Sequence, residues 1–192
     1  MLTTPPFIDI IYAQPTVAPF MSKRHYLPLL CLLAALIACS PQYNWREVHG
    51  NNVPFTVLMP AKSDAFTQNV DLNGTQVAMT MTAADVADTT FAVGTASFGD
   101  AAAAQNALIQ MKTALIANIA GKPLDIVPPG KEIANVHSIT LAAIGSDRGK
   151  PLKMLGRLYN IDNRAYQVIM VGDPKKMNDD AIETFFTSFQ PN

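Results

Sequence analysis

The chain between residues 45 and 97 alternates between hydrophobic and polar residues, and turn-forming residues separate the alternating segments. This two-residue period is typical of β-strands, which place successive side chains on opposite faces of a sheet. We expect strands over residues 45–48, 53–59, 66–72, 75–82 and 89–97. Asn73-Gly74 separates the third strand from the fourth and is a strong signal for a two-residue hairpin. This part of the chain therefore predicts antiparallel strands joined by tight turns.

A helical period replaces the alternation after Asp100. Hydrophobic residues then recur three or four positions apart as far as Gly121. They are Ala104, Leu108, Met111, Leu115 and Ile119. Asp100 offers a carboxylate that can cap the first turn, and Gly121 is placed as the C-terminal glycine. The pattern predicts a long helix with one apolar face.

Strand patterns return after a segment that prolines interrupt. Pro123 and Pro128-Pro129-Gly130 break regular structure on either side of residues 124–127, for which we expect a short strand. Longer strands are expected over residues 136–144, 152–161 and 165–171. We expect a polar loop at residues 145–150 between the first two of these, and a turn at Asp162-Asn163 between the last two. The second half of the chain therefore also predicts hairpins.

A second helix with an apolar stripe ends the pattern. Asn178 can cap its first turn, and Met177 and Ile182 occupy the positions of a hydrophobic staple. The stripe consists of Ile182, Phe185, Phe186 and Phe189. The order of hairpins, helix, hairpins and helix predicts one α+β domain over residues 45–192, in which two main helices flank an antiparallel sheet.

Charge and cysteine content narrow the possible functions. The chain has 14 basic and 15 acidic residues and a formal net charge of −1. Basic residues do not cluster beyond Lys175-Lys176, so nucleic-acid binding is not expected. No cysteine follows Cys39, which excludes disulfides and thiolate metal sites from the predicted domain. Its stability must therefore come from packing.

The chain before the predicted domain follows a different pattern. Lys23-Arg24-His25 precedes an apolar run over residues 27–38, which is the layout of a secretory signal peptide. This run is shorter than the roughly 20 residues that a membrane-spanning helix needs, and this favours cleavage. Residues 1–20 contain four prolines, an aspartate and no basic residue, so they do not fit a signal peptide. We expect translation to start at Met21 and residues 1–20 to be a mis-assigned upstream segment.

The end of the apolar run, Leu36-Ile37-Ala38-Cys39, resembles the lipobox of bacterial lipoprotein signal peptides. The resemblance implies that residues 21–38 are removed and that Cys39 receives acyl chains on its sulfur and its amine. Each buried methylene contributes about 0.8 kcal/mol, so several chains would hold the protein on a membrane. In that family, Ser40 at the second mature position implies export to the outer membrane. We therefore expect a lipid anchor on the periplasmic face of the outer membrane.

A short tether, residues 39–44, follows from this interpretation. At roughly 3.5 Å per extended residue it reaches only about 20 Å, so the domain should stay close to the bilayer. Tyr43 and Trp45 lie next to the anchor in sequence and allow two interpretations. In the first interpretation, they make an interfacial contact with the membrane. In the second, they belong to the core of the domain.

The end of the chain resembles a known fold family. Residues 157–169 carry a late hairpin with an inward tyrosine, and residues 182–189 end a short helix in Ser188-Phe189. This combination resembles the end of the PsbP-like α/β/α sandwiches. Residues 44–48 and 89–94 are also similar to small uncharacterised lipoproteins of Gram-negative bacteria. The resemblance implies an accessory role in assembling, docking or stabilising envelope complexes, and it brings no catalytic residue with it.

Candidates for catalysis and metal binding are few. Ser97 lies in Gly94-Thr95-Ala96-Ser97-Phe98-Gly99, which resembles a nucleophile elbow but is one place off the GxSxG pattern. His49 and His137 are the only histidines after Cys39, and neither has the spacing of a metal ligand. Methionine sulfur can bind copper, but Met79 and Met81 fit the core face of a strand. We expect no catalytic, metal-binding or cofactor-binding residue.

Three hypotheses for function follow. The leading hypothesis is a non-enzymatic, lipid-anchored module that binds an envelope protein or assists assembly at the outer membrane. The alternative is a carrier of a small apolar ligand, with a pocket between the sheet and the helix of residues 100–121. The third is a serine hydrolase that uses Ser97 with His49 or His137 as its base. The sequence leaves the oligomeric state open.

Overall fold

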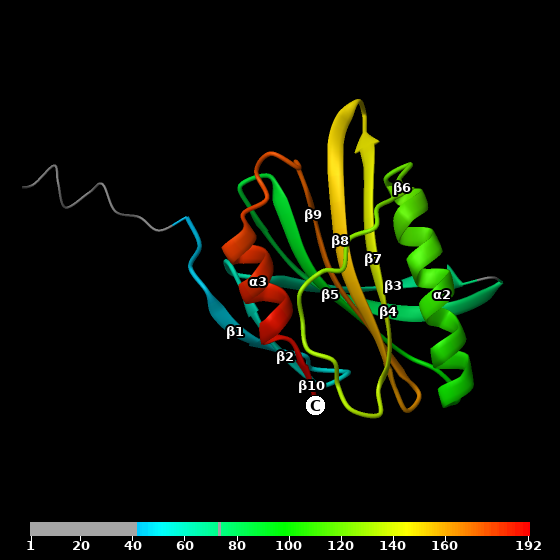
Figure 1. Ribbon diagram of the computed structural model, residues 1–192. Coiled ribbons are helices and arrows are strands. Elements are labelled where there is room, and N and C mark those ends of the chain that lie inside the picture. Colours follow the sequence, from blue (N-terminus) through cyan, green and yellow to red (C-terminus); the bar gives the residue numbers. More distant parts are fainter. Residues whose placement is uncertain (1–41, 73) are drawn as a thin grey trace, which may run out of the picture. The chain divides into compact units, whose positions relative to one another are not determined.

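A computed structural model of the protein describes residues 42–72 and 74–192 (Figure 1). The lipobox, Cys39 and Met21 lie outside the described residues, as does Asn73. The lipidation and the start site therefore stay predictions. No helix in the described part of the chain is long and apolar enough to cross a membrane.

A seven-stranded antiparallel sheet forms the centre of the domain. Its strands are β3 (Asp64–Leu72), β4 (Thr75–Val86), β5 (Thr89–Ser97), β6 (Lys122–Pro123), β7 (His137–Asp147), β8 (Lys150–Ile161) and β9 (Arg164–Gly172). Their order across the sheet is β3-β4-β5-β9-β8-β7-β6. Most neighbours are consecutive hairpin partners, but β5 pairs with β9 and so joins the two halves of the chain. Figure 1 shows β3 and β4 twisted strongly away from the direction of β7 and β8.

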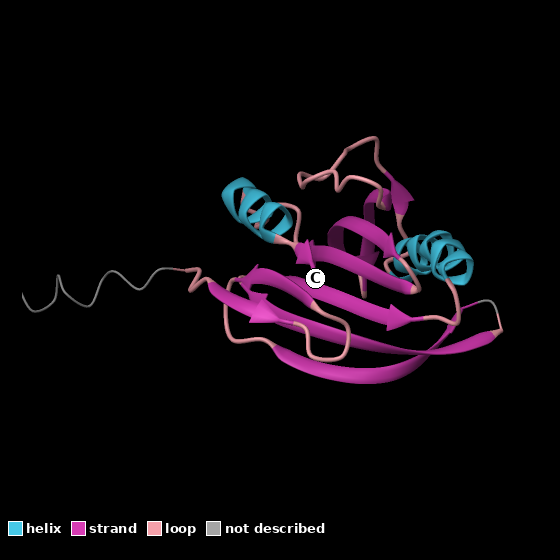
Figure 2. Cartoon of the chain, turned by 90° about the horizontal axis from the view of Figure 1, so that it is seen from below, coloured by secondary structure: helices cyan, strands magenta, loops and turns pink. Residues whose placement is uncertain are grey.

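A smaller sheet and two helices cover this main sheet. The small sheet has the order β1-β2-β10, and it consists of β1 (Arg46–His49), β2 (Phe55–Met59) and β10 (Gln190–Pro191). The helices are α2 (Ala101–Asn118) and α3 (Asp179–Ser188), which lie well apart in Figure 2. The buried side chains place α2 on one face of the main sheet, and α3 with the small sheet on the other. The prediction of an α+β fold with two helices against an antiparallel sheet is confirmed.

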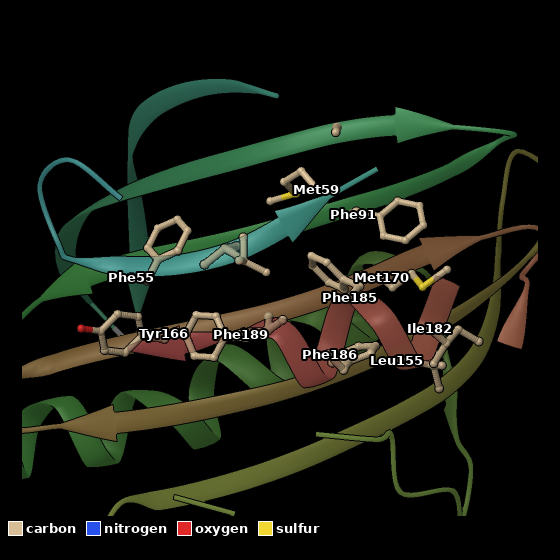
Figure 3. Packing of buried hydrophobic residues seen from close by; sticks show 14 of the residues in the cluster. Phe55, Met59, Phe91, Leu155, Tyr166, Met170, Ile182, Phe185, Phe186 and Phe189 are labelled. Carbon is tan, nitrogen blue, oxygen red and sulfur yellow. The ribbon is translucent and has the colours of Figure 1, made fainter. Parts of the chain in front are cut away.

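Alternate residues along each strand divide the core into two clusters. On β5, Phe91 and Val93 contact the cluster under α3, whereas Ala92 and Ala96 contact the cluster under α2. We call these two sides the α3 face and the α2 face of the main sheet. The α3 face is rich in aromatic side chains, many of which are visible in Figure 3.

Ring contacts hold the α3 face together. The ring of Phe91 packs edge-on against Phe185 with 5.3 Å between centroids, and Tyr159 stacks on Phe189 at the same distance. Burial raises the pKa of Tyr159 and of Tyr166, because the ionised phenolate would lose its hydration there. The Tyr166 hydroxyl donates a hydrogen bond to the carbonyl of Pro54, 3.2 Å away.

Both predicted helix starts are confirmed. The Asp100 carboxylate accepts a hydrogen bond of 2.8 Å from the backbone N–H of Ala103 at the start of α2. The Asn178 side chain accepts one of 2.9 Å from the N–H of Ala181 at the start of α3. The predicted apolar stripes of both helices lie in the core. Local capping chemistry therefore identifies both starts correctly.

The end of α2 differs from the prediction. The left-handed residue after the helix is Ala120, with φ of 47°, and not Gly121. The N–H of Ala120 bonds to the carbonyl of Ala117, and the N–H of Gly121 bonds to that of Ile116, which is the hydrogen-bond pattern of a Schellman motif. Gly121 is needed for space instead, because an added Cβ would lie 2.9 Å from the Ile119 side chain.

Several strand assignments also differ from the prediction, and β4 extends to Val86 instead of ending at Thr82. The strand expected at residues 124–127 is absent. A two-residue strand, β6, lies just before this segment and pairs with β7, because the end of α2 directs the chain onto β7. The polar loop expected at residues 145–150 is mostly strand. Its turn is Arg148-Gly149, and both residues have positive φ, which a two-residue hairpin favours. The two-residue strand β10 was not predicted, since so short a segment shows no periodicity.

Candidate ligand-binding groove

An apolar groove of about 680 Å³ lies on the α2 face, between the C-terminal half of α2 and the strands β3, β4, β8 and β9. The apolar side chains that line it include Phe66, Val70, Leu72, Met79, Met81, Met111, Leu115, Ile119, Leu152, Met154, Ile169 and Val171. The polar ones are Gln68, Asn118, Gln167 and two carboxylates, Asp71 and Asp147. Its position is the one that the carrier hypothesis expects, between the sheet and the first long helix.

The floor of the groove is shaped by one row of residues across the sheet. Met81 on β4 pairs with Gly94 on β5, which in turn pairs with Gln167 on β9. A Cβ at Gly94 would lie 2.6 Å from the Gln167 side chain and 2.7 Å from the Met81 sulfur. The missing side chain of Gly94 therefore allows Gln167 and Met81 to meet across the strand between them.

Gln167 is the buried polar residue of the groove. It is 5% exposed, and its Nε2 donates to the Met81 sulfur at 3.3 Å. A thioether is a weak acceptor, so this contact satisfies the amide poorly. A carbonyl or hydroxyl oxygen in the groove would be a stronger partner. Gln167 is therefore suited to orient one polar group of an otherwise apolar ligand.

Methionines make up much of the groove wall. Met79, Met111 and Met154 are buried, and Met81 is partly exposed. The sequence interpretation of Met79, Met81 and Met111 as apolar packing residues agrees with these positions. Because methionine side chains are unbranched and flexible, they can adapt to the shape of a bound molecule.

The mouth of the groove is partly open to solvent. Phe66 on the edge strand β3 is 53% exposed, and Ala114 on α2 is exposed at the rim. An exposed phenylalanine beside an apolar groove extends the surface that a ligand can cover. The small side chain of Ala114 leaves the entrance clear.

Tyr43 and Trp45, the predicted interfacial pair, both pack against the α3 face. Their rings stack on each other with 5.7 Å between centroids. Each ring also meets Phe91 edge-on, at 6.4 Å for Tyr43 and 6.2 Å for Trp45. Both residues are half-buried, so they take part in the core, and a membrane contact of their remaining surface stays a prediction.

Ser97 and His137 are not brought together, and the ring nitrogens of His49 have other partners. Ser97 ends β5, and its neighbour Ala96 is connected to His137 by successive pairings through β9 and β8 to β7. Three strand spacings of roughly 4.8 Å separate such residues by about 14 Å, beyond hydrogen-bond reach. His49 belongs to the small sheet, where its ring nitrogens lie 3.2 Å from the Thr56 hydroxyl and 3.1 Å from the Glu47 carboxylate. This arrangement does not support the hydrolase hypothesis.

Among the described residues, no three His, Cys, Asp or Glu side chains converge in a way that could hold a metal ion. Sequence reasoning did not identify Gly94, Gln167 or Phe66 as site residues. A signal for Gln167 was present, because it is the one polar residue in the apolar run of residues 165–171. The position of Gly94 beneath it depends on the pairing of β5 with β9, which has no local signature.

Comparisons with known proteins do not add to this description. No protein-family model matches the chain, and no curated protein matches it significantly. The function must therefore be argued from the groove and its residues.

Proposed function

We propose that this protein is a non-enzymatic binding module that holds a small apolar ligand in the groove beside α2. The observation that carries the proposal is an apolar groove of about 680 Å³ with a buried, poorly satisfied amide on its floor. Small-molecule sites typically have volumes of about 300–1,000 Å³ and combine apolar walls with a few polar groups.

The lining residues define the chemistry of the ligand. Leucine, isoleucine, valine and methionine side chains favour an aliphatic or isoprenoid body. The Nε2 of Gln167 favours a carbonyl or hydroxyl oxygen on that body, because this oxygen would replace the Met81 sulfur as acceptor. The ligand is therefore an apolar molecule with one polar oxygen.

The proposal includes a cellular location and a fold family. The lipobox and Ser40 support a lipid anchor at Cys39 on the periplasmic face of the outer membrane. The short tether would keep the groove near the bilayer, where apolar molecules accumulate. One helix on each face of the main sheet supports a PsbP-like α/β/α sandwich. A fold of this kind constrains function weakly, so the groove remains the main support.

A second candidate function is docking to an envelope protein. The connection between β6 and β7 exposes two apolar residues, Ile126 at 45% and Val127 at 69%. The buried Arg157 holds this connection in place, since its Nε donates to the Pro128 carbonyl at 3.1 Å and its Nη1 to Glu132 at 3.0 Å. Long ordered connections of this kind are often functional.

Native mass spectrometry tests the carrier function. Residues 42–192 contain both hydrophobic clusters, so this segment, exported to the periplasm without its anchor, is compared with its denatured mass. We expect a non-covalent adduct in the native protein. Ala114→Trp should abolish the adduct by filling the mouth of the groove. The matched control Ala117→Trp places the same side chain on an exposed position of α2 outside the groove and should retain it.

A bare native mass for the parent protein would contradict the carrier function, as would an adduct that survives Ala114→Trp. Crosslinking of the full chain in its own envelope then tests the second candidate. Val127→Asp should abolish a crosslinked partner, whereas Ile109→Asp, at an equally exposed apolar position on α2, should not. If the crosslinked partner is lost in both variants, or in neither, the 124–136 connection is excluded as the docking site.

A further inference from the structure

A second cavity, of about 370 Å³, lies on the α3 face, between β3, β4 and the connection from β1 to β2. It differs from the groove in chemistry, because hydroxyl and amide groups line much of it. Its polar lining includes Thr67, Thr80, Thr82, Thr95, Asn51 and Asn52. At roughly 30 Å³ per water molecule, the cavity has room for about a dozen waters.

Threonines form the floor of this cavity. Thr67 on β3, Thr80 on β4 and Thr95 on β5 are directly paired and make one row across the sheet. The hydroxyls of Thr67 and Thr80 lie 2.8 Å apart and bond to each other. Thr82 follows two residues after Thr80 on the same side of β4. The twist and pairing of three strands thus place four hydroxyl groups against one space.

Two of these threonines are almost fully buried. Thr82 is 7% exposed and Thr95 is 3% exposed, although both line the cavity. Their hydroxyl groups line the cavity, and neither oxygen is among the fully buried side-chain atoms that lack a partner in the described part of the chain. These two hydroxyl groups can therefore bond to whatever occupies the cavity, water or a ligand.

The walls carry no full charge. Among the described residues that line the cavity there is no Lys, Arg, Asp or Glu. His49 lies at the wall, but its ring nitrogens already face Thr56 and Glu47. An anionic ligand would lack a counter-charge, and an apolar one would leave the hydroxyls unsatisfied. Threonine hydroxyls and asparagine amides both donate and accept hydrogen bonds, as do the hydroxyl groups of a sugar.

We propose that this cavity binds one ring of a neutral saccharide, with Thr82 and Thr95 bonding its hydroxyl groups at the floor and Asn51 and Asn52 bonding it from the overhanging connection. The cavity and the apolar groove lie on opposite faces of the main sheet and share one lining residue, Phe66 on the edge strand β3. The saccharide site therefore does not depend on the proposed carrier function.

Chemical-shift titration by NMR tests this proposal. The full chain, labelled with nitrogen-15 and held in zwitterionic detergent micelles, is titrated with N-acetyl-D-glucosamine, D-glucose and, for comparison, inorganic phosphate. We expect saturable shifts of the amide signals of Asn51, Thr80 and Thr95 with at least one sugar. Thr95→Val should weaken binding about five- to tenfold, since it removes one hydrogen bond without changing the side-chain shape.

Matched variants make the outcome decisive. Thr140→Val changes a threonine on β7, away from the cavity, and should leave binding unchanged. Thr82→Val replaces Thr95→Val if the latter does not give a folded spectrum. Ala114→Trp, which closes the groove on the other face, should also leave sugar binding unchanged. The proposal is overturned if neither sugar gives saturable shifts, if the folded threonine variant binds as tightly as the parent, or if phosphate binds more tightly than both sugars.

Discussion

The two faces of the main sheet are built from different kinds of side chain. The α3 face buries seven aromatic residues, Phe55, Phe91, Tyr159, Tyr166, Phe185, Phe186 and Phe189, whose rings contact one another. The buried cluster of the α2 face contains no aromatic residue within the described part of the chain. It consists of alanine, leucine, methionine, valine and isoleucine.

This difference explains where the protein is solid and where it has space. Each aromatic side chain buries about 150–250 Å² and leaves little room around its rigid ring. Alanine leaves space, and methionine fills it only in some of its conformations. The α3 face therefore supports the fold, and the α2 face provides the groove. The threonine-lined cavity borders the aromatic cluster at Phe55 and lies over the threonines of β3, β4 and β5.

The largest expected effect is the loss of an aromatic residue from the α3 face. Phe91 is fully buried and its ring contacts those of Tyr43, Trp45 and Phe185. We expect Phe91→Ala to lower the free energy of unfolding by about 3–5 kcal/mol, because a cavity would remain among rigid rings. Met79→Ala, at the wall of the groove, should cost only about 2 kcal/mol, since flexible neighbours can close the gap. Urea unfolding measures the free energy of unfolding of both variants. Equal losses would contradict the contrast between a rigid α3 face and an adaptable α2 face.

High pH should weaken the α3 face. The pKa of Tyr159 and that of Tyr166 are raised by burial, so above a pH of about 10 the unfolded chain loses these protons while the folded chain keeps them. Stability is therefore complete below that pH and is lost as the pH rises through the folded-state pKa values. Thermal melting between neutral and alkaline pH measures this loss. The double variant Tyr159→Phe/Tyr166→Phe should have a flatter pH dependence, and an unchanged slope would exclude these residues as its origin.

A smaller effect of opposite sign is expected at the end of α2. Ala120 has a left-handed backbone, which costs an alanine about 1–2 kcal/mol. Ala120→Gly should raise the free energy of unfolding by about 0.5 kcal/mol, after the greater flexibility of glycine in the unfolded chain is counted. Ala117→Gly, in the last turn of the same helix, should lower it by up to about 1 kcal/mol. Calorimetry of both variants tests the sign of the change in stability. A loss of stability in both variants would argue against strain at Ala120.

The smallest effect is expected at a turn that belongs to neither face. Asp88 lies in the two-residue turn between β4 and β5 and pairs with Lys176. The hydrogen bond and the charge of Lys176 lower the pKa of Asp88, and Asp88 raises that of Lys176. The contribution of Asp88 is therefore present above its ordinary pKa and is lost as the pH falls through the lower folded value.

Both side chains of this pair are largely exposed, so solvent screens them. Asp88→Asn keeps a residue that tolerates the positive φ of 57° and should change the melting temperature less than any variant above. Melting curves at low and high salt measure the remaining difference. A clear loss of stability that persists at high salt would show that Asp88 does more than pair with a surface lysine.

Much of the fold was predictable because its signals are local. The carboxylate of Asp100 and the side-chain amide of Asn178 cap the helices that follow them within a few residues. Alternating hydrophobic residues identified most strands, and Gly74 adopts the positive φ of 85° that its hairpin needs. The prediction failed at the end of α2, where Ala120 and not Gly121 takes the left-handed position, and at β10, which is too short to have a period.

The groove and the cavity depend on contacts that the chain makes only after folding. The sequence by itself determined the two long helices and most of the hairpins, because these depend on neighbouring residues. Only the tertiary structure decided that β5 pairs with β9, which brings Met81, Gly94 and Gln167 into one row. It also decided which face receives the aromatic side chains of α3 and which keeps a groove. The register between strands more than 60 residues apart is set by the packing of the whole core, so no short stretch of sequence encodes it.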